Sequence, residues 1–301
     1  MPRKRRQPPL SLHGAGGARP PNMKSALLFL ILFCLWLTGC DRSPTQATPS
    51  VEKTIEPSSA PIATNAPPAP DPTAMILQQA LALKAAGKLA DARDLLQPLT
   101  AATNAPDNVL TLLGELNSQI VFTPAAAPEK VDYTIVEGDS LGKLAKKFGT
   151  TIELIKKSNG RTSDMIRVGD RLRIYQGKFA VLISKTANTL TVTDNGKFFK
   201  RYRVGTGQFN RTPSGEFKIV SRIEKPPWYR PDGRTIPFGD PENILGTHWL
   251  GLDIPRYGIH GTWETNSIGQ QSSAGCIRLL NDDVAELYVL LPTGTPVTIH
   301  D

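Results

Sequence analysis

The chain has 301 residues, of which 40% are hydrophobic and 21% charged, a composition that excludes a multi-span membrane protein, a coiled coil and a wholly disordered chain. Its formal net charge of +8 would suggest a nucleic-acid partner, but the first 39 residues hold six lysines and arginines and no acid. From residue 40 onward 29 basic residues stand against 27 acidic ones, so the basicity belongs mostly to the leader and we expect no nucleic-acid partner.

The leader contains an apolar run that ends at a cysteine. Residues 26–37 (ALLFLILFCLWL) are too few to span a bilayer, which takes about 20, so we predict that residues 1–39 are a signal peptide. The sequence Leu37-Thr38-Gly39-Cys40 resembles the lipobox of bacterial lipoproteins. The resemblance implies cleavage before Cys40, lipid attachment to its thiol and a membrane anchor that faces the periplasm. The alternative is a plain secretory signal or a short membrane anchor in which the cysteine is a coincidence.

Three cysteines occur in the chain, and two of them are accounted for by this leader. Cys34 would leave with the signal peptide and Cys40 would carry the lipid, so Cys276 is the one free thiol expected in the exported protein. It has no partner for an internal disulfide. A lone thiol in an oxidising compartment is either buried and inert or kept for chemistry.

Residues 40–72 form a proline-rich segment. Eight prolines, many small polar residues and almost no large apolar residues mean that this stretch cannot build a packed core. We therefore predict a linker. Fully extended as polyproline II, it would reach on the order of 100 Å at about 3.1 Å per residue.

Residues 73–122 return to a helical pattern, with apolar residues spaced three and four apart. The stretch GKLADARDLL resembles the middle of a tetratricopeptide-type repeat, which implies a turn at Gly87 and a packing face that carries Ala92 and Leu96. Only one such unit is evident, whereas an independent array needs about three. We predict a small helical spacer, with a partner-binding platform as the alternative.

Residues 132–175 have the order strand, helix, helix, strand. Ser140 is the expected N-cap of the first helix, and Gly149 is expected to end it. The segment resembles the lysin motif (LysM) through Tyr133, Gly138-Asp139-Ser140-Leu141, Ala145, Leu154, Asn159, Gly169-Asp170 and Leu172. The family implies binding to glycan that contains N-acetylglucosamine; a structural spacer without carbohydrate affinity is the alternative.

Residues 178–300 have the pattern of a β-rich domain. Short apolar strands alternate with glycine and proline turns, which indicates a β-sandwich or barrel; the expected strands are residues 179–184, 190–203, 217–223, 248–252 and 296–300. Asn195-Gly196 suits a two-residue type I′ hairpin, which would set Val192 opposite Phe199. One helix is expected from Asn281, because acids occupy its first turn.

Cys276 and His260 carry the chemistry expected of this domain. A cysteine attacks as a thiolate, so we expect a nearby base and a thiol pKa below the usual value of about 8.5. His260 is the base candidate, and the Gly261 carbonyl could hold the other ring N–H. The N–H groups of Gly275 and Cys276 could form part of an oxyanion hole, and Arg278 offers a fork suited to a substrate carboxylate. His248 and His300 lack such neighbours.

This region resembles the catalytic domain of bacterial L,D-transpeptidases. The family pattern, HG followed by S-x-G-C-[IV]-R, is present as His260-Gly261 and as residues 273–278, SAGCIR. The resemblance implies that Cys276 is the nucleophile and His260 the base, with Ser273, Gly275 and Arg278 in the pocket. The chain departs from many members at Ala274, where they have a second histidine.

The resemblance implies acyl transfer on the stem peptides of peptidoglycan. The thiol would attack the carbonyl of stem residue three, expel the terminal D-alanine and form a thioester, which an amine then resolves. No metal or other cofactor is expected. Two alternatives stay open: an L,D-carboxypeptidase, in which water resolves the thioester, and a non-catalytic scaffold that binds peptidoglycan in the cell envelope.

Overall fold

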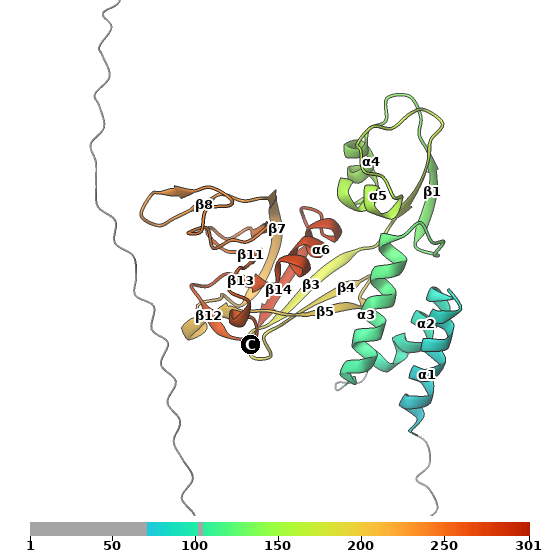
Figure 1. The fold of residues 1–301 in the computed structure, drawn as a ribbon, viewed down its shortest axis with the longest axis horizontal. Coiled ribbons are helices and arrows are strands. Elements are labelled where there is room, and N and C mark those ends of the chain that lie inside the picture. The colour runs from blue at the N-terminus through green and yellow to red at the C-terminus, as the bar shows by residue number, and fades with distance from the viewer. Residues whose placement is uncertain (1–70, 102–104) are drawn as a thin grey trace, which may run out of the picture. The chain divides into compact units, whose positions relative to one another are not determined.

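The computed structural model describes residues 71–101 and 105–301, so the predicted signal peptide, Cys40 and nearly all of the proline-rich linker lie outside the described residues. All described residues belong to the same compact unit of the chain. Figure 1 shows its helices and strands in chain order. Among the helices described, none is both long enough and apolar enough to cross a bilayer.

The helical segment has three α-helices and one 3-10 turn: α1 Pro72–Ala85, α2 Leu89–Leu96, η1 Gln97–Ala101 and α3 Asp107–Phe122. Asp71 caps α1 by accepting from the N–H of Thr73 at 3.0 Å. Gly87 turns the chain with φ +75°, and both Ala92 and Leu96 are fully buried, as the repeat-like pattern predicts.

Helix α3 packs on strand β5 (Lys197–Arg203), which is an edge strand of the large sheet. The buried side chain of Asn117 donates from Nδ2 to the carbonyl oxygens of Phe199 at 2.8 Å and Phe198 at 3.4 Å. Phe198 also packs against the core of the helical segment. The segment is therefore packed against the β domain and covers an open sheet edge.

The second module has the predicted strand, helix, helix, strand order: β1 Lys130–Thr134, α4 Leu141–Phe148, α5 Ile152–Ser158 and β2 Arg171–Tyr175. β1 and β2 pair antiparallel. Ser140 caps α4 by accepting from the N–H of Lys143, and Gly149 ends that helix in the left-handed conformation with φ 64°. Both predicted helix boundaries are confirmed.

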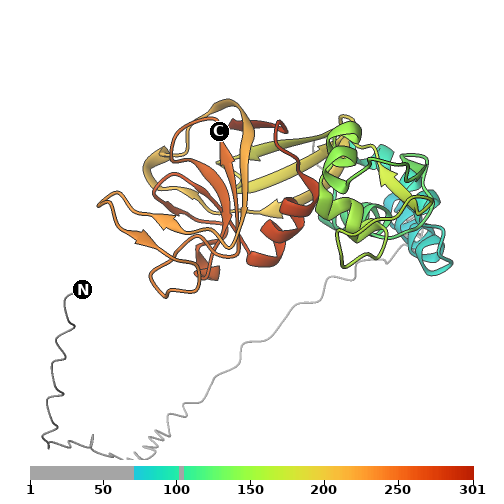
Figure 2. The same ribbon diagram turned by 90° about the horizontal axis from the view of Figure 1, so that it is seen from above.

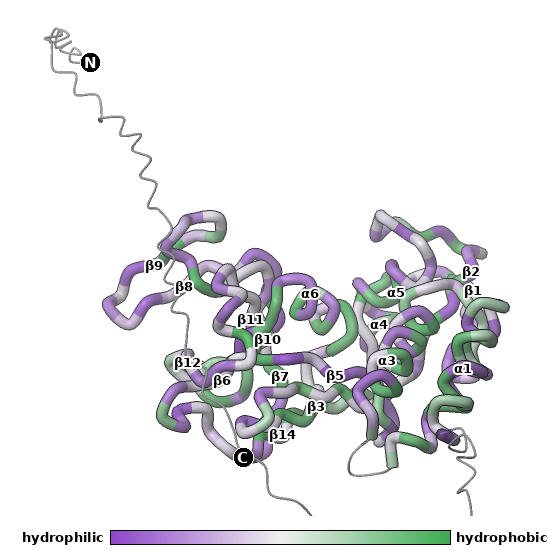
Figure 3. The backbone as a smooth tube through the Cα atoms, turned by 60° about the horizontal axis from the view of Figure 1, so that its bottom comes forward, coloured by the Kyte–Doolittle hydropathy of each residue, from purple (hydrophilic) through white to green (hydrophobic). Residues whose placement is uncertain are grey.

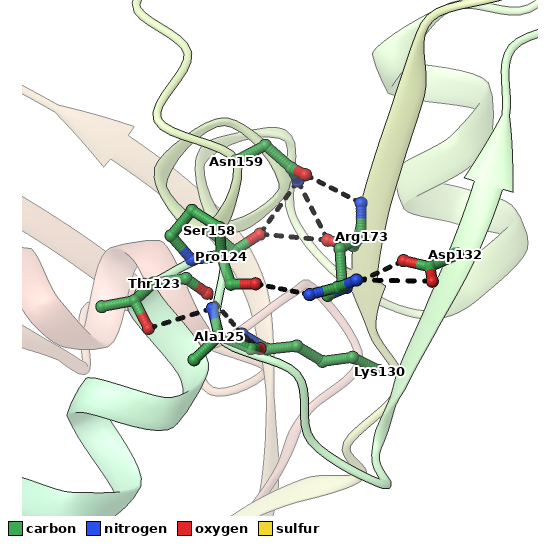
Figure 4. Close-up of polar contacts among 8 residues, drawn as sticks. All are labelled: Thr123, Pro124, Ala125, Lys130, Asp132, Ser158, Asn159 and Arg173. Atoms are coloured by element: carbon green, nitrogen blue, oxygen red, sulfur yellow. Dashed lines mark hydrogen bonds and ion pairs between the residues drawn. The ribbon is translucent and has the colours of Figure 1, made fainter. Parts of the chain in front are cut away.

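Arg173 on β2 joins this module to the segment that follows α3 (Figure 4). Its guanidinium donates to Asp132 Oδ1 at 2.8 Å and to the carbonyl oxygen of Pro124 at 2.7 Å. Asn159 holds the Arg173 backbone on both sides, because it accepts from the N–H at 2.7 Å and donates to the carbonyl at 2.9 Å.

Lys130 on β1 also binds the segment that follows α3. Its ammonium donates to the carbonyl oxygens of Thr123 at 2.5 Å and Ala125 at 3.2 Å. Burial, together with the positive charge of Arg173, lowers the pKa of Lys130 to about 8. The proline- and alanine-rich stretch between α3 and β1 is thus held by defined hydrogen bonds to the module of β1, α4, α5 and β2, which is called the LysM module below after the family that it resembles.

The β domain is built on one eight-stranded mixed sheet with the order β13-β11-β10-β7-β14-β3-β4-β5, which curves into a nearly closed barrel. Its strands are β3 Phe179–Ser184, β4 Thr189–Asp194, β5 Lys197–Arg203, β7 Gly215–Glu224, β10 His248–Leu252, β11 Gly258–Gly261, β13 Ile277–Leu279 and β14 Pro296–His300. The smaller elements are β6 Thr206–Gly207, η2 Gln208–Asn210, β8 Trp228–Tyr229, β9 Thr235–Ile236, η3 Thr265–Ser267, β12 Gln271–Ser273 and α6 Asn281–Leu290. The predicted barrel-like fold is confirmed.

The β4–β5 hairpin corrects one expectation. Asn195 and Gly196 both have positive φ, as a type I′ turn requires. The register shifts between Val192 and Thr193, however, so Val192 lies opposite Lys200 and the predicted pairing with Phe199 is wrong. A β-bulge adds one residue to β5, and its carbonyl is the one that Asn117 binds at 2.8 Å.

The LysM module also packs directly on the β domain. Leu154 of α5 is 1% exposed and belongs to the same hydrophobic core as the large sheet. Thr151 donates from Oγ1 to the carbonyl oxygen of Val289 at the end of α6, and Arg222 of β7 forms an ion pair with Glu153 at 2.9 Å. Figure 2 shows α6 beside the LysM helices.

The chain between β7 and β10 forms an excursion that includes the β8–β9 hairpin. Many of its residues are hydrophilic (Figure 3), and Arg230 and Arg234 form ion pairs with Asp232 and Glu242. The base of the excursion is fixed by Asn243, which is 2% exposed and donates to three backbone carbonyl oxygens.

Candidate active site

Two adjacent parallel strands, β11 and β13, bring the predicted catalytic residues together. Ile259 lies opposite Ile277, and both side chains are fully buried in the core. His260 lies opposite Arg278, so these side chains emerge on the other face of the sheet. Cys276 directly precedes β13, two residues before Arg278. The topology therefore places the thiol, imidazole and guanidinium at one end of one strand pair.

The thiol of Cys276 is half-buried and faces a backbone carbonyl. Its sulfur lies 3.4 Å from the carbonyl oxygen of Arg256, which accepts the thiol hydrogen. Burial raises the pKa of Cys276, while the N–H of Gly258 and the charge of Arg278 act in the opposite direction. The expected thiol pKa below the usual value is therefore wrong for the resting site, because burial outweighs both stabilising contacts.

His260 is 2% exposed, and one of its ring nitrogens has a fixed role. Nδ1 lies 2.7 Å from the carbonyl oxygen of Gly261. Since a carbonyl only accepts, Nδ1 carries the hydrogen and Nε2 of the neutral ring keeps its lone pair. Burial lowers the pKa of His260 to about 4, so the imidazole is neutral at pH 7. The predicted carbonyl contact of Gly261 is present.

The loop before Cys276 is held by Ser273 and Gly275. Ser273 donates from Oγ to the Cys276 carbonyl oxygen at 2.7 Å and accepts from the N–H of Gly275 at 3.0 Å. Gly275 has φ +139°, and a Cβ there would lie 2.7 Å from the Tyr257 ring, so no other residue fits. Because the Gly275 N–H already has an acceptor, its expected place in an oxyanion hole is not supported; the N–H of Cys276 stays a prediction.

Arg278 is tied to an acid. Its Nη1 forms an ion pair with Glu264 Oε2 at 2.8 Å, and the Arg278 side chain is 12% exposed. The Nε atom is buried without a hydrogen-bond partner. The Arg278 guanidinium was expected to bind a substrate carboxylate, but its Nη1 already donates to Glu264. Its Nε–H remains a donor without an acceptor.

Three residues that the sequence analysis did not identify also shape the site. Thr212, fully buried, donates to the Gly275 carbonyl oxygen at 2.8 Å and accepts from the N–H of Gly207. Asn281, the first residue of α6, donates to the Thr262 carbonyl oxygen, and Trp249 stacks on His260. Their contacts join different segments of the chain, which sequence patterns do not reveal. The sequence indicated only that Asn281 stands at the start of a helix.

The other described histidines lie elsewhere. His248 packs its ring against Tyr288 at 4.7 Å and contacts Thr247 Oγ1 at 3.0 Å, as expected of a structural residue. His300 is exposed near the end of the chain and contacts the backbone of Asp301. Within residues 71–101 and 105–301 no group of three or more histidine, cysteine, aspartate or glutamate side chains is arranged to hold a metal ion.

Comparison with known proteins decides the family. Residues 178–299 match the L,D-transpeptidase catalytic domain (YkuD), and residues 133–174 match the LysM domain. The chain is 33% identical over 175 residues to the putative L,D-transpeptidase YkuD of Bacillus subtilis, covering 56% of this chain and 98% of that protein. The chain belongs to the L,D-transpeptidase family.

The chain is also similar to other proteins that are named L,D-transpeptidases. The putative L,D-transpeptidase YqjB of Bacillus subtilis is 40% identical over 127 residues, which cover 40% of this chain and 70% of that protein. A solved L,D-transpeptidase from Mycobacterium smegmatis is 24% identical with a TM-score of 0.37, and the match covers 45% of this chain and 65% of the solved one.

This L,D-transpeptidase is therefore a cysteine-dependent transferase. The transpeptidase and LysM domains both imply peptidoglycan as the material on which it acts, and hence a location in the cell envelope outside the cytoplasm.

Proposed function

We propose that the enzyme forms a thioester between Cys276 and a peptidoglycan stem tetrapeptide and transfers the acyl group to an amine. The observation that carries this proposal is the hydrogen bond from His260 Nδ1 to the Gly261 carbonyl oxygen at 2.7 Å. It leaves Nε2 as the basic atom of a neutral imidazole, on the sheet face that also carries Arg278 and, beside it, Cys276.

The first step is attack on the carbonyl carbon of stem residue three. Cys276 turns its thiol from the Arg256 carbonyl toward His260 and forms the sulfur–carbon bond as its proton passes to Nε2. Because burial raises the thiol pKa and lowers the imidazole pKa, both groups are neutral before substrate binds. Proton transfer therefore accompanies the attack.

Collapse of the tetrahedral intermediate breaks the bond to the terminal D-alanine. The imidazolium of His260 returns its proton to the leaving amine, and the acyl group stays on sulfur as a thioester. An amine from a second stem peptide or from a protein lysine then attacks the thioester, and His260 accepts the proton of that amine. The second tetrahedral intermediate then breaks its carbon–sulfur bond, and the His260 imidazolium returns the proton to the Cys276 sulfur. The free thiol and the neutral imidazole are restored, so atoms and charges balance over the cycle.

The LysM module supports a role on intact wall material. We propose that residues 132–175 hold glycan that contains N-acetylglucosamine and so raise the local concentration of stem peptides near Cys276. We also propose that Cys40 carries a lipid that anchors the enzyme to a membrane facing the periplasm. The Cys40→Ser protein should then leave the membrane fraction, and an unchanged distribution would disprove the anchor.

The decisive experiment incubates the exported chain with disaccharide-tetrapeptides and identifies the products by mass spectrometry. Cross-linked dimers support transpeptidation, trimmed tripeptides indicate a carboxypeptidase, and unchanged substrate indicates a non-catalytic scaffold. Cys276→Ala and His260→Ala should each abolish most of the turnover while the fold is kept. A folded His260→Ala enzyme with near-native turnover would refute the assigned base.

A further inference from the structure

The indole of Trp249 lies nearly parallel to the imidazole of His260. The two residues are direct partners in the antiparallel β10–β11 pair, so their side chains share one face of the sheet. Their ring centroids are 5.8 Å apart, and their planes differ by 22°. This is the offset-stacked arrangement of aromatic pairs.

Two glycines make room for this indole. Gly251 and Gly258 are partners in the same strand pair. A Cβ on Gly258 would lie 2.5 to 2.8 Å from three carbons of the Trp249 ring. A Cβ on Gly251 would lie 2.8 Å from Trp249 Nε1 and 2.3 Å from Ser221 Oγ. Neither glycine has a positive φ, so the backbone does not require glycine at these positions. The space for a flat indole requires glycine at 258, and at 251 the indole shares this role with Ser221.

The proposed reaction changes the charge beside this ring. His260 is neutral in the resting site and becomes a cation when it takes the proton of Cys276. The face of an indole carries negative partial charge and attracts a cation within about 6 Å of its centroid, with no comparable attraction for a neutral ring. Stacking on the indole therefore stabilises the imidazolium of His260 more than the neutral imidazole. This difference lowers the activation barrier of the step in which Cys276 loses its proton.

The other titratable groups around His260 do not supply this attraction. Arg278, opposite His260 on β13, disfavours a positive imidazole, and its ion pair with Glu264 offsets only part of that repulsion. Cys276 is neutral in the resting site at pH 7, because burial raises its pKa. Among these neighbours Trp249 presents an aromatic face to the imidazole.

We infer that Trp249 is a positioning residue for His260: its indole fixes the plane of the imidazole and stabilises the imidazolium that forms when Cys276 loses its proton. This inference rests on the proposed roles of Cys276 and His260. It assigns the Gly251–Gly258 pair to the same purpose, since larger residues there would displace the indole.

The test uses the exported chain with Trp249→Phe and Trp249→Leu. Two quantities are measured: the ¹⁵N shifts of the His260 ring nitrogens from pH 7.5 to pH 2.5, and the rate at which a carbapenem acylates Cys276 at pH 7.5, read as a mass increase of one drug molecule. In Trp249→Leu, protonation of His260 should shift to lower pH by about 0.5 to 1 pH unit, and acylation should slow by about 3- to 10-fold. Trp249→Phe keeps a flat ring and should recover most of both.

Trp228→Leu is the matched control, because Trp228 is also half-buried but lies on β8 and stacks on Arg230. It should leave both readouts unchanged. The inference is overturned if folded Trp249→Leu has the same His260 protonation midpoint and the same acylation rate as the native enzyme. It is also overturned if Trp249→Phe is acylated as slowly as Trp249→Leu while its His260 midpoint equals that of the native enzyme. The titration needs no turnover, so its result stands apart from failure of the proposed transpeptidase mechanism.

Discussion

Asn281 donates from Nδ2 to the carbonyl oxygen of Thr262 at 3.1 Å, one residue beyond the Gly261 carbonyl that holds His260. Its Oδ1 accepts from the N–H of Thr247 at 3.0 Å, so one side chain at the start of α6 ties together the chain segments before β10 and after β11. The orientation of the base thus depends on a helix that contributes no reacting atom.

Removal of this clamp should therefore reduce catalysis. We expect Asn281→Ala to lower kcat by about 10- to 100-fold with a smaller change in KM, because a displaced Gly261 carbonyl misplaces the imidazole. Asn281→Asp keeps the acceptor for Thr247 but loses the donor, so it should be nearly as slow. Steady-state assays with tetrapeptide substrate, with thermal melts to verify folding, check this. Native kcat in Asn281→Asp would show that the donor is dispensable.

The burial of Cys276 predicts its reactivity toward simple alkylating agents. Since burial raises the thiol pKa, alkylation by iodoacetamide should be slower at pH 7 than for free cysteine, with a midpoint above about 8.5. Arg278→Gln should move the midpoint higher still, because it removes a positive charge that favours the thiolate. Arg234→Gln, on the exposed hairpin, serves as the control. A midpoint below 8 would contradict this account.

His260 should make the fold sensitive to acid. Its pKa is about 4 in the folded protein and about 6.5 in the unfolded chain, so the unfolded chain binds more protons between these values. The stability that His260 contributes is complete above pH 6.5 and is lost as the pH falls toward 4. At pH 5 this loss is about 2 kcal/mol. Urea unfolding at pH 7.5 and pH 5 should show this loss in the free energy of unfolding. His260→Gln should lose less stability between the two pH values, because it lacks the contribution of His260. Equal losses in the native and variant proteins would show that His260 is not the cause.

The buried amide of Asn117 should contribute to stability without affecting chemistry. Asn117→Ala leaves the carbonyl oxygens of Phe198 and Phe199 without their donor, so the free energy of unfolding should fall by about 1–3 kcal/mol. Gln119→Ala, an exposed position on the same helix, is the matched control and should cost far less. Specific activity at 25 °C should be unchanged in both. Equal stability of the two variants would mean that α3 does not depend on this contact.

Local sequence patterns predicted the elements well where the determinants are local. The bounds of β3, β10 and β14 agree with the predicted strands, and the Ser140 cap and Gly149 end of α4 follow from side-chain and backbone preferences within one turn. The motif also predicts that His260 and Cys276 share one site; the β11–β13 register places both residues at the same end of that strand pair, and their catalytic pairing stays a prediction.

Features that depend on distant parts of the chain were not predictable in this way. The bulge opposite Val192 accompanies the packing of α3, which lies more than 70 residues earlier in the chain. The raised pKa of Cys276 reflects its burial in the folded domain, which no spacing rule encodes. The stacking of Trp249 on His260 requires the β10–β11 register, and a strand pattern alone does not specify a partner.

Leu154 has a consequence for how the enzyme responds to its surroundings. Because this LysM leucine is buried in the core of the transpeptidase domain, opening either module exposes apolar surface of the other, and the two should unfold together. Any ligand that binds only the folded LysM module then raises the free energy of unfolding of the whole unit. Enzyme in contact with wall glycan should resist heat and proteolysis better than enzyme free in solution, so its lifetime would depend on the presence of the polymer it modifies.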